Sequence, residues 1–166
     1  PEINSDFTFG IGEDGTEGYL YPATPMQANG ASYPTEDDYF NFICTPNGIY
    51  INEYMSSGQN VIYDEDGVFS DWVEIINTTD EDVSLAGYCL TDDPHKPYRY
   101  VLPDVTIAGH GTLLIFLDGE DKVGYQYIHA NFSISTDDAS LNLFDSSHTL
   151  VDTVKVVETD ERISYG

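Results

Sequence analysis

From Gly48 onward, the sequence consists of short apolar runs separated by clusters of Gly, Pro, Asn, Asp and Ser. The clusters recur about every 8 to 15 residues, and no window keeps the 3.6-residue period of an amphipathic helix. This spacing is typical of a β-sandwich or β-barrel without crossover helices. We therefore predict an all-β fold with strands at 49–55, 72–77, 83–85, 88–91, 99–102, 113–117, 141–144 and 150–157.

Alternation along three of these strands predicts which side chains form the core, because residues two positions apart share one face of a strand. Three apolar pairs are expected to point inward: Ile49 with Ile51, Val73 with Ile75, and Leu141 with Leu143. Residues 113–117 are apolar throughout, as expected of a central strand that is covered on both faces. A surface strand that faces a partner module would have the same composition.

The charge balance restricts the possible partners. Five Lys and Arg stand against 30 Asp and Glu, which gives a net charge of −25. Such a surface repels phosphate groups, so we expect neither nucleic acid nor an anionic membrane as a partner. No stretch approaches the apolar length needed to span a bilayer, so no membrane insertion is expected. An acidic surface attracts Ca²⁺ or a basic partner, and it also keeps an extracellular protein soluble.

The two cysteines, Cys44 and Cys89, are too few for a disulfide framework. One bridge between them and two separate thiols are both compatible with the sequence.

Residues 1–43 have a different composition, which is rich in Gly, Pro, Asp and Thr and contains repeated turn signals. They also contain several aromatic residues: Tyr19, Tyr21, Tyr33, Tyr39, Phe40 and Phe42. We expect residues 31–43 to pack in an ordered way against the following domain. The alternative is that aromatic rings beside carboxylates bind sugar rings.

Several phrases occur in a characteristic order: Ile51-Asn52-Glu53-Tyr54, then Asp71-Trp72-x-Glu74-x-x-Asn77, Gly87-Tyr88-x-Leu90-Thr91-Asp92 and Ala130-Asn131-Phe132-Ser133-Ile134. Together they resemble the lamin tail domain in the form carried by bacterial secreted multidomain proteins. The resemblance covers about residues 48–166 and is strongest over 51–103. It implies an immunoglobulin-like β-sandwich that serves as a binding and spacing module and not as an enzyme.

The two ends of the chain resemble each other. Asp6-Phe7-Thr8-Phe9-Gly10 near the start is similar to Arg162-Ile163-Ser164-Tyr165-Gly166 at the end. We therefore predict that residues 1–43 are an N-terminal extension resembling the C-terminal end of a preceding repeat, and that residues 44–166 are the lamin-tail-type domain. The start at Pro1, without an initiator Met or signal peptide, suggests a piece of a longer exported protein.

The loop at residues 64–71 is the best metal candidate. Asp64, Asp66 and Asp71 offer carboxylate oxygens around an Asp-x-Asp-Gly turn, and Ca²⁺ takes six to eight oxygen ligands. The loop lacks the third acidic position and the final bidentate Glu of an EF-hand. The alternative is an inter-strand loop whose Asp side chains cap turn N–H groups.

No catalytic residue is predicted. Asp71 and Glu74 are the only pair considered for a glycosidase, but Glu74 lies mid-strand on the face opposite Val73, where we expect it to accept a hydrogen bond from a backbone N–H or from Arg99. The histidines fall in turns or at strand ends without metal-ligand spacing: His95, His110, His129 and His148.

We therefore expect a non-catalytic, extracellular or cell-surface module of a larger bacterial protein, which positions or adheres an attached domain. Its expected partners are other domains of the parent chain, and carbohydrate or protein at the cell surface. The acidic surface predicts a monomer. The alternative is a Ca²⁺-dependent or carbohydrate-binding adhesive module, and a more remote one is a small glycosidase. Apart from Ca²⁺, no cofactor is expected.

Overall fold

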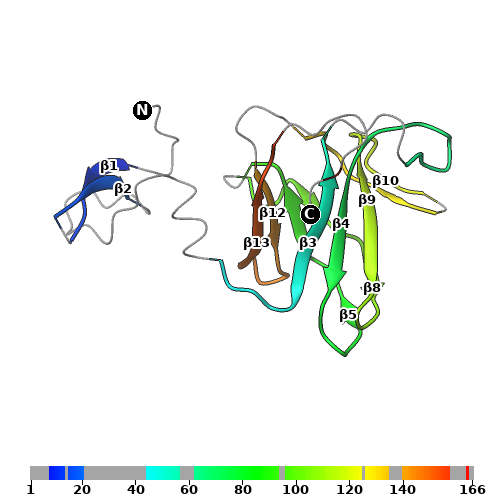
Figure 1. The fold of residues 1–166 in the computed structure, drawn as a ribbon, viewed down its shortest axis with the longest axis horizontal. Helices are drawn as coiled ribbons and strands as arrows, with labels where there is room; N and C mark the ends of the chain where they lie inside the picture. The colour runs from blue at the N-terminus through cyan, green and yellow to red at the C-terminus, as the bar shows by residue number, and fades with distance from the viewer. Residues whose placement is uncertain are drawn as a thin grey trace. The chain divides into compact units, whose positions relative to one another are not determined.

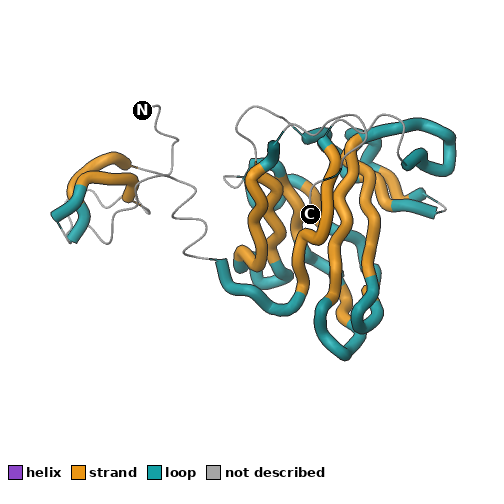
Figure 2. Tube along the Cα trace, viewed as in Figure 1, coloured by secondary structure: helices purple, strands orange, loops and turns teal. Residues whose placement is uncertain are grey.

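The computed structural model describes residues 8–13, 15–20, 44–56, 62–93, 96–124, 126–134, 140–157 and 164. The chain divides into two compact units, Pro1–Cys44 and Thr45–Gly166. Every regular element in the described residues is a β-strand, as the sequence predicts (Figures 1 and 2). Among the same residues, no helix has the length and apolarity needed to cross a membrane.

The first unit contains a small antiparallel hairpin. Strand β1 (Thr8–Ile11) pairs with β2 (Glu17–Leu20), and Gly15 closes the turn with a φ of 82°. Turn signals near these residues are visible in the sequence, but the two strands were not predicted. The expectation that residues 31–43 pack against the following domain, and the aromatic side chains considered for sugar binding, fall outside the described residues.

The second unit is a sandwich of two sheets. The five-stranded sheet has the order β10-β11-β9-β4-β3, where the strands are β10 (Lys122–Val123), β11 (Ile128–His129), β9 (Thr112–Leu117), β4 (Asp71–Asn77) and β3 (Ile49–Met55). The four-stranded sheet has the order β13-β12-β6-β7, where the strands are β13 (Leu150–Lys155), β12 (Ser140–Phe144), β6 (Cys89–Thr91) and β7 (Tyr100–Val101). A separate ribbon pairs β5 (Val83–Ser84) with β8 (Thr106–Ile107).

The predicted strands are confirmed, with ends that differ by at most two residues. The sequence missed β8, β10 and β11, which are each two residues long. Strand β9 lies between β4 and β11, so its predicted central position is confirmed. It pairs antiparallel with β4 but parallel with β11. Runs of two residues carry too little alternation to be read as strands, and their pairing depends on the rest of the sheet.

The core lies between the two sheets. All six residues predicted to point inward are buried in it: Ile49, Ile51, Val73, Ile75, Leu141 and Leu143. A β-bulge between Ile51 and Glu53 shifts the alternation of β3 by one residue, so Tyr54 also faces this core. Burial of this apolar surface is the main source of stability in such a fold.

A second apolar cluster lies on the other face of the five-stranded sheet. Met55, Trp72 and Phe116 come from β3, β4 and β9, and Ile62 and Tyr127 pack against them. The sheet is therefore covered on both faces near its middle strands. The loops that cover this outer face carry the site described below.

Asn77 and Cys89 of the second unit are both fully buried. The side-chain amide of the buried Asn77 donates hydrogen bonds to the carbonyls of Glu81, Ile107 and Ala108, which fixes the turn after β4. Cys89 is a free, buried thiol, so the bridge to Cys44 that the sequence left open is not formed.

Hydrogen bonds hold the edge of the five-stranded sheet at β3, here called the β3 margin. One acceptor is a carboxylate, and the other groups are neutral. The backbone N–H of Ile51 donates to Asp152 Oδ2 of β13 at 2.7 Å. The Tyr54 hydroxyl accepts a hydrogen bond from the N–H of Val157 at 2.9 Å. These contacts join the edges of the two sheets.

Candidate functional site

The loop that the sequence singled out forms a tight hairpin, residues 62–70, here called the acidic hairpin. Tyr63 and Phe69 form an isolated antiparallel bridge, and the N–H of Asp64 donates to the carbonyl of Val68 at 3.0 Å. Asp64 Oδ1 accepts hydrogen bonds from the N–H groups of Asp66 and Val68, at 2.8 and 2.9 Å. Asp64 therefore has the turn-capping role that was the alternative to metal binding.

The acidic hairpin rests on a buried histidine. His129 lies on β11, and its side chain is fully buried although its neighbours Ile128 and Ala130 face the opposite, apolar core. Its ring stacks on Phe116, the residue beside it on β9, with ring centroids 5.5 Å apart and planes at 20°. Alternation along β11 thus places the imidazole on the outer face of the sheet.

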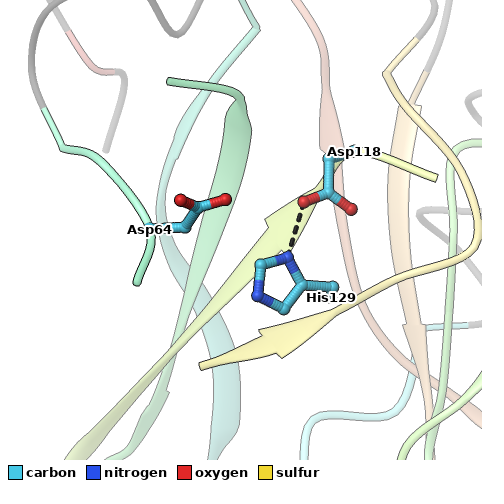
Figure 3. A group of neighbouring side chains, drawn as sticks. All are labelled: Asp64, Asp118 and His129. Atoms are coloured by element: carbon cyan, nitrogen blue, oxygen red, sulfur yellow. Dashed lines mark hydrogen bonds and ion pairs between the residues drawn. The ribbon is translucent and has the colours of Figure 1, made fainter. Parts of the chain in front are cut away.

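Carboxylates contact both ring nitrogens of His129. Nδ1 lies 2.6 Å from Asp118 Oδ2, a contact drawn as a dashed line in Figure 3, and Nε2 lies 3.3 Å from Glu65 Oε2. Asp118 follows the end of β9, whereas Glu65 belongs to the acidic hairpin. An imidazole with a carboxylate at each nitrogen is satisfied on both sides when it is a protonated imidazolium, since both nitrogens are then donors.

Glu65 reaches His129 through a gap that a glycine provides. A Cβ at Gly124 would collide with the Glu65 carboxylate and would lie 2.9 Å from the carbonyl of Tyr127. The N–H of Gly124 also donates to that Tyr127 carbonyl at 2.7 Å, which closes the turn between β10 and β11. The absent side chain at position 124 therefore makes room for the buried contact.

A second, more exposed ion pair joins the acidic hairpin to β10. Lys122 Nζ lies 3.0 Å from Asp66 Oδ2 and 2.5 Å from Glu120 Oε2. Because Lys122 stands opposite His129 in the β10–β11 pair, its side chain lies on the same face of the sheet. Two segments distant in sequence are therefore joined by one buried and one exposed charged contact.

The charges in this cluster shift each other's pKa. Burial alone would lower the pKa of His129, but its hydrogen bonds and charge interactions with Asp118 and Glu65 raise it above the usual range. Burial alone would raise the pKa of Asp64, but the N–H groups of Val68 and Asp66 and the positive charges of His129 and Lys122 lower it. Hydrogen bonds to Glu120 and Asp66 raise the pKa of Lys122. The cluster therefore favours a charged imidazolium among charged carboxylates.

Asp64, Asp118 and His129 form a group that could hold a metal ion (Figure 3). One ligand atom from each residue lies within 4.8 Å of the others. Of the three aspartates predicted as Ca²⁺ ligands, only Asp64 belongs to this group. Asp66 points to Lys122, and Asp71 opens β4. An imidazole nitrogen in the donor set suits a transition metal better than Ca²⁺, which takes oxygen ligands.

The carboxylates considered for a glycosidase do not converge. Asp71 and Glu74 are three residues apart on β4, which pairs with β9 without a bulge, so their side chains lie on opposite faces. Glu74 accepts a hydrogen bond from the side-chain amide of Asn52 at 2.6 Å. Arg99, which the sequence offered as a partner for Glu74, instead pairs with Asp92.

The sequence reasoning missed Glu65, Asp118 and His129 as members of one site. The spacing of metal ligands along the chain does not reveal His129, because its carboxylates lie 11 and 64 residues away. One signal was available: a histidine beside Ile128 in an apolar run is expected on the opposite face of a strand, where it needs polar partners.

The family model described as Lamin Tail Domain matches residues 45–158. This range contains every strand of the sandwich, from β3 to β13, and the whole charged cluster. No curated protein matches the sequence.

Proposed function

The chain belongs to the lamin tail domain family, and on that premise we propose that it is a non-catalytic, extracellular or cell-surface module of a larger bacterial protein, where it positions or adheres an attached domain. The observation that carries the proposal is the family match over residues 45–158, because this family is one of immunoglobulin-like modules and not typically of enzymes. The fold alone would not decide the function, since one sandwich supports many.

The use of the charged side chains supports a non-catalytic role. Those of the charged cluster hold the acidic hairpin in place: Asp64 caps its turn, and Glu65 joins His129. Asp71 and Glu74 lie on opposite faces of β4, so they do not flank one substrate bond as a glycosidase requires.

The charge supports an extracellular setting and a monomer. A net charge of −25 keeps copies of the chain apart and disfavours nucleic acid and anionic lipid as partners.

Adhesion is tested with the full chain coupled to beads. We expect saturable attachment of these beads to washed bacterial cells or to purified cell-wall material, and loss of attachment after heat unfolding. Beads that carry polyglutamate of similar charge are the control. Attachment no stronger than that of polyglutamate beads would contradict an adhesive role. Hydrolysis of aryl glycosides that Glu74→Gln abolishes would contradict the non-catalytic role.

A second candidate function is the binding of a divalent cation, which the group of Asp64, Asp118 and His129 favours. A cation there competes with the proton of His129, so its binding strengthens as the pH rises. Thermal melts of the wild type and of Asp118→Asn with EDTA, Ca²⁺ or Zn²⁺ test it, because an ion bound only to the folded state raises the midpoint. Zn²⁺ is expected to raise the wild-type midpoint more than Ca²⁺. Curves that superimpose in all three conditions would reject this candidate.

A further inference from the structure

The outward side of the acidic hairpin carries large apolar side chains in solvent. Tyr63 is 62% exposed, Val68 is 51% exposed and Phe69 is 41% exposed. The rings of Tyr63 and Phe69 stand perpendicular, with their centroids 6.0 Å apart and planes at 89°. Single exposed apolar residues are common, but the paired rings of Tyr63 and Phe69 form a local patch, and Val68 is also exposed on the same nine-residue segment.

The patch is held in a fixed position. The inward side of the same hairpin is tied down by Asp64, which caps the turn, and by Glu65 and Asp66, which contact His129 and Lys122. Folding has therefore already ordered the backbone beneath Tyr63 and Phe69. A preorganised surface loses less entropy when it binds a partner than a mobile loop does.

Partly exposed carboxylates lie on the same hairpin and on the segment that precedes β10. The side chains of Asp66 and Glu120 are 65% and 45% exposed, and Asp121 is also exposed. Lys122 is the one Lys or Arg beside them in the described part of this region, and both Asp66 and Glu120 already contact it. The patch therefore combines aromatic faces with excess negative charge.

The negative charge of the chain indicates which kind of partner fits this surface. A second copy of the chain would bring another net charge of −25. Residues 1–44 contain no Lys or Arg, so they offer no complementary charge either. Lys and Arg side chains fit both features, because their stems pack on apolar surface and their cationic heads favour aromatic faces and carboxylates.

We propose that the exposed aromatic pair of the acidic hairpin, Tyr63 and Phe69, is a docking surface for a basic segment of another protein, with the partly exposed carboxylates of Asp66 and Glu120 on the neighbouring side of the hairpin. This inference rests on the proposed function, because it names the class of partner for an adhesive module. The aromatic pair supplies the contact area, and the carboxylates select the sign of the partner's charge.

The experiment measures the fluorescence anisotropy of a labelled peptide that alternates lysine and leucine, titrated with the full chain. A peptide that alternates glutamate and leucine is the probe control. The test variant is Tyr63→Ser with Phe69→Ser. The matched control is Tyr98→Ser with Val101→Ser, which removes an aromatic and a valine that are 57% and 54% exposed elsewhere on the sandwich. Urea unfolding verifies that each variant is folded. If a double variant does not fold, its two single substitutions are tested in its place.

We expect the lysine peptide to bind and the glutamate peptide not to bind. The Tyr63→Ser, Phe69→Ser variant should weaken binding at least about tenfold, whereas the matched control should not change it.

Equal binding by both double variants would mean that the peptide responds to overall charge, and it would overturn the proposal. Binding of chitin or cellulose oligosaccharides that depends on Tyr63 and Phe69, without peptide binding, would assign the surface to sugars and would also overturn it. So would the absence of any peptide binding. In each case the bead assay on cells remains an independent test, so failure of this inference is distinguishable from failure of the adhesive role.

Discussion

The two edges of the five-stranded sheet are secured by different chemistry. At the β3 margin, a backbone N–H and a tyrosine hydroxyl join the two sheets, through Ile51 with Asp152 and Tyr54 with Val157. At the other edge, here called the β10 margin, charged groups join the sheet to the acidic hairpin. There the imidazole of His129 lies between two carboxylates.

Two aspartates make the contrast specific. Asp64 at the β10 margin and Asp152 at the β3 margin each accept two backbone N–H hydrogen bonds. Burial outweighs these bonds at Asp152 and raises its pKa. At Asp64, where burial also acts to raise the pKa, the same kind of bonds and the positive charges of His129 and Lys122 lower it. The comparison teaches that the β10 margin depends on a balance of charges, whereas the β3 margin depends on burial and hydrogen bonds.

The largest expected effect comes from removing the imidazolium. His129→Gln leaves Asp118 and Glu65 without their buried cationic partner, and we expect a loss of about 3 kcal/mol in the free energy of unfolding. Urea unfolding at neutral pH measures it. His110→Gln is the matched control, because His110 is largely exposed and contacts the exposed Asp80. Equal, small losses in both variants would show that the buried cluster does not stabilise the fold.

The β10 margin should also respond to alkaline pH. The raised pKa of His129 means that its contribution is complete below the unfolded value of about 6.5, and that it is lost as the pH rises through the folded value. The charged groups that face it are Glu65, Asp64, Asp118 and Glu120, so a neutral ring loses favourable contacts on every side.

Urea midpoints from about pH 6 to about pH 10 measure this dependence. The wild type should lose stability over a range in which His129→Gln stays level. Parallel curves for the two proteins would contradict the assignment of this dependence to His129.

The β3 margin should show a smaller effect that does not depend on the charge of histidine. Tyr54→Phe removes the buried hydroxyl that accepts a hydrogen bond from the N–H of Val157, just beyond β13, and we expect a loss of about 1.5 kcal/mol in the free energy of unfolding. The loss should be the same at neutral pH and in the alkaline range. Tyr63→Phe, which changes an exposed tyrosine, should have no measurable effect. A Tyr54→Phe loss that varied with the charge of His129 would remove the distinction between the margins.

The smallest effect is expected for Asp66→Asn. Asp66 and Lys122 form an exposed pair, and salt screens such pairs. The urea midpoint should move less than for Tyr54→Phe, and the difference should disappear in molar sodium chloride. A loss as large as that of His129→Gln would mean that the exposed pair, and not the buried imidazolium, holds the hairpin.

Most of the fold could be predicted from the sequence, because long strands with one buried face carry their own signal. The inward pairs, such as Val73 with Ile75, follow from alternation, and the central position of 113–117 follows from its continuous apolar run. The same reasoning identified the loop at Asp64 and its turn-capping alternative. The identification of residues 1–43 as the end of a preceding repeat stays a prediction.

The charged cluster could not be predicted, because it depends on contacts between distant segments. The pairing of β11 with β9 is parallel and only two residues long, yet it puts His129 beside Phe116. The role of Gly124 appears only once the Glu65 side chain is seen to occupy the space where a Cβ would be. Spacing along the chain carries no information on either contact.

The most direct test of this account is the protonation state of His129, read from the ¹⁵N chemical shifts of its ring in a pH titration of the full chain. The account predicts a charged imidazolium at neutral pH, with a pKa above the ordinary value of about 6.5. A neutral ring at pH 7, with one nitrogen without a proton, would contradict it. The acidic hairpin would then be held by something other than a buried ion pair.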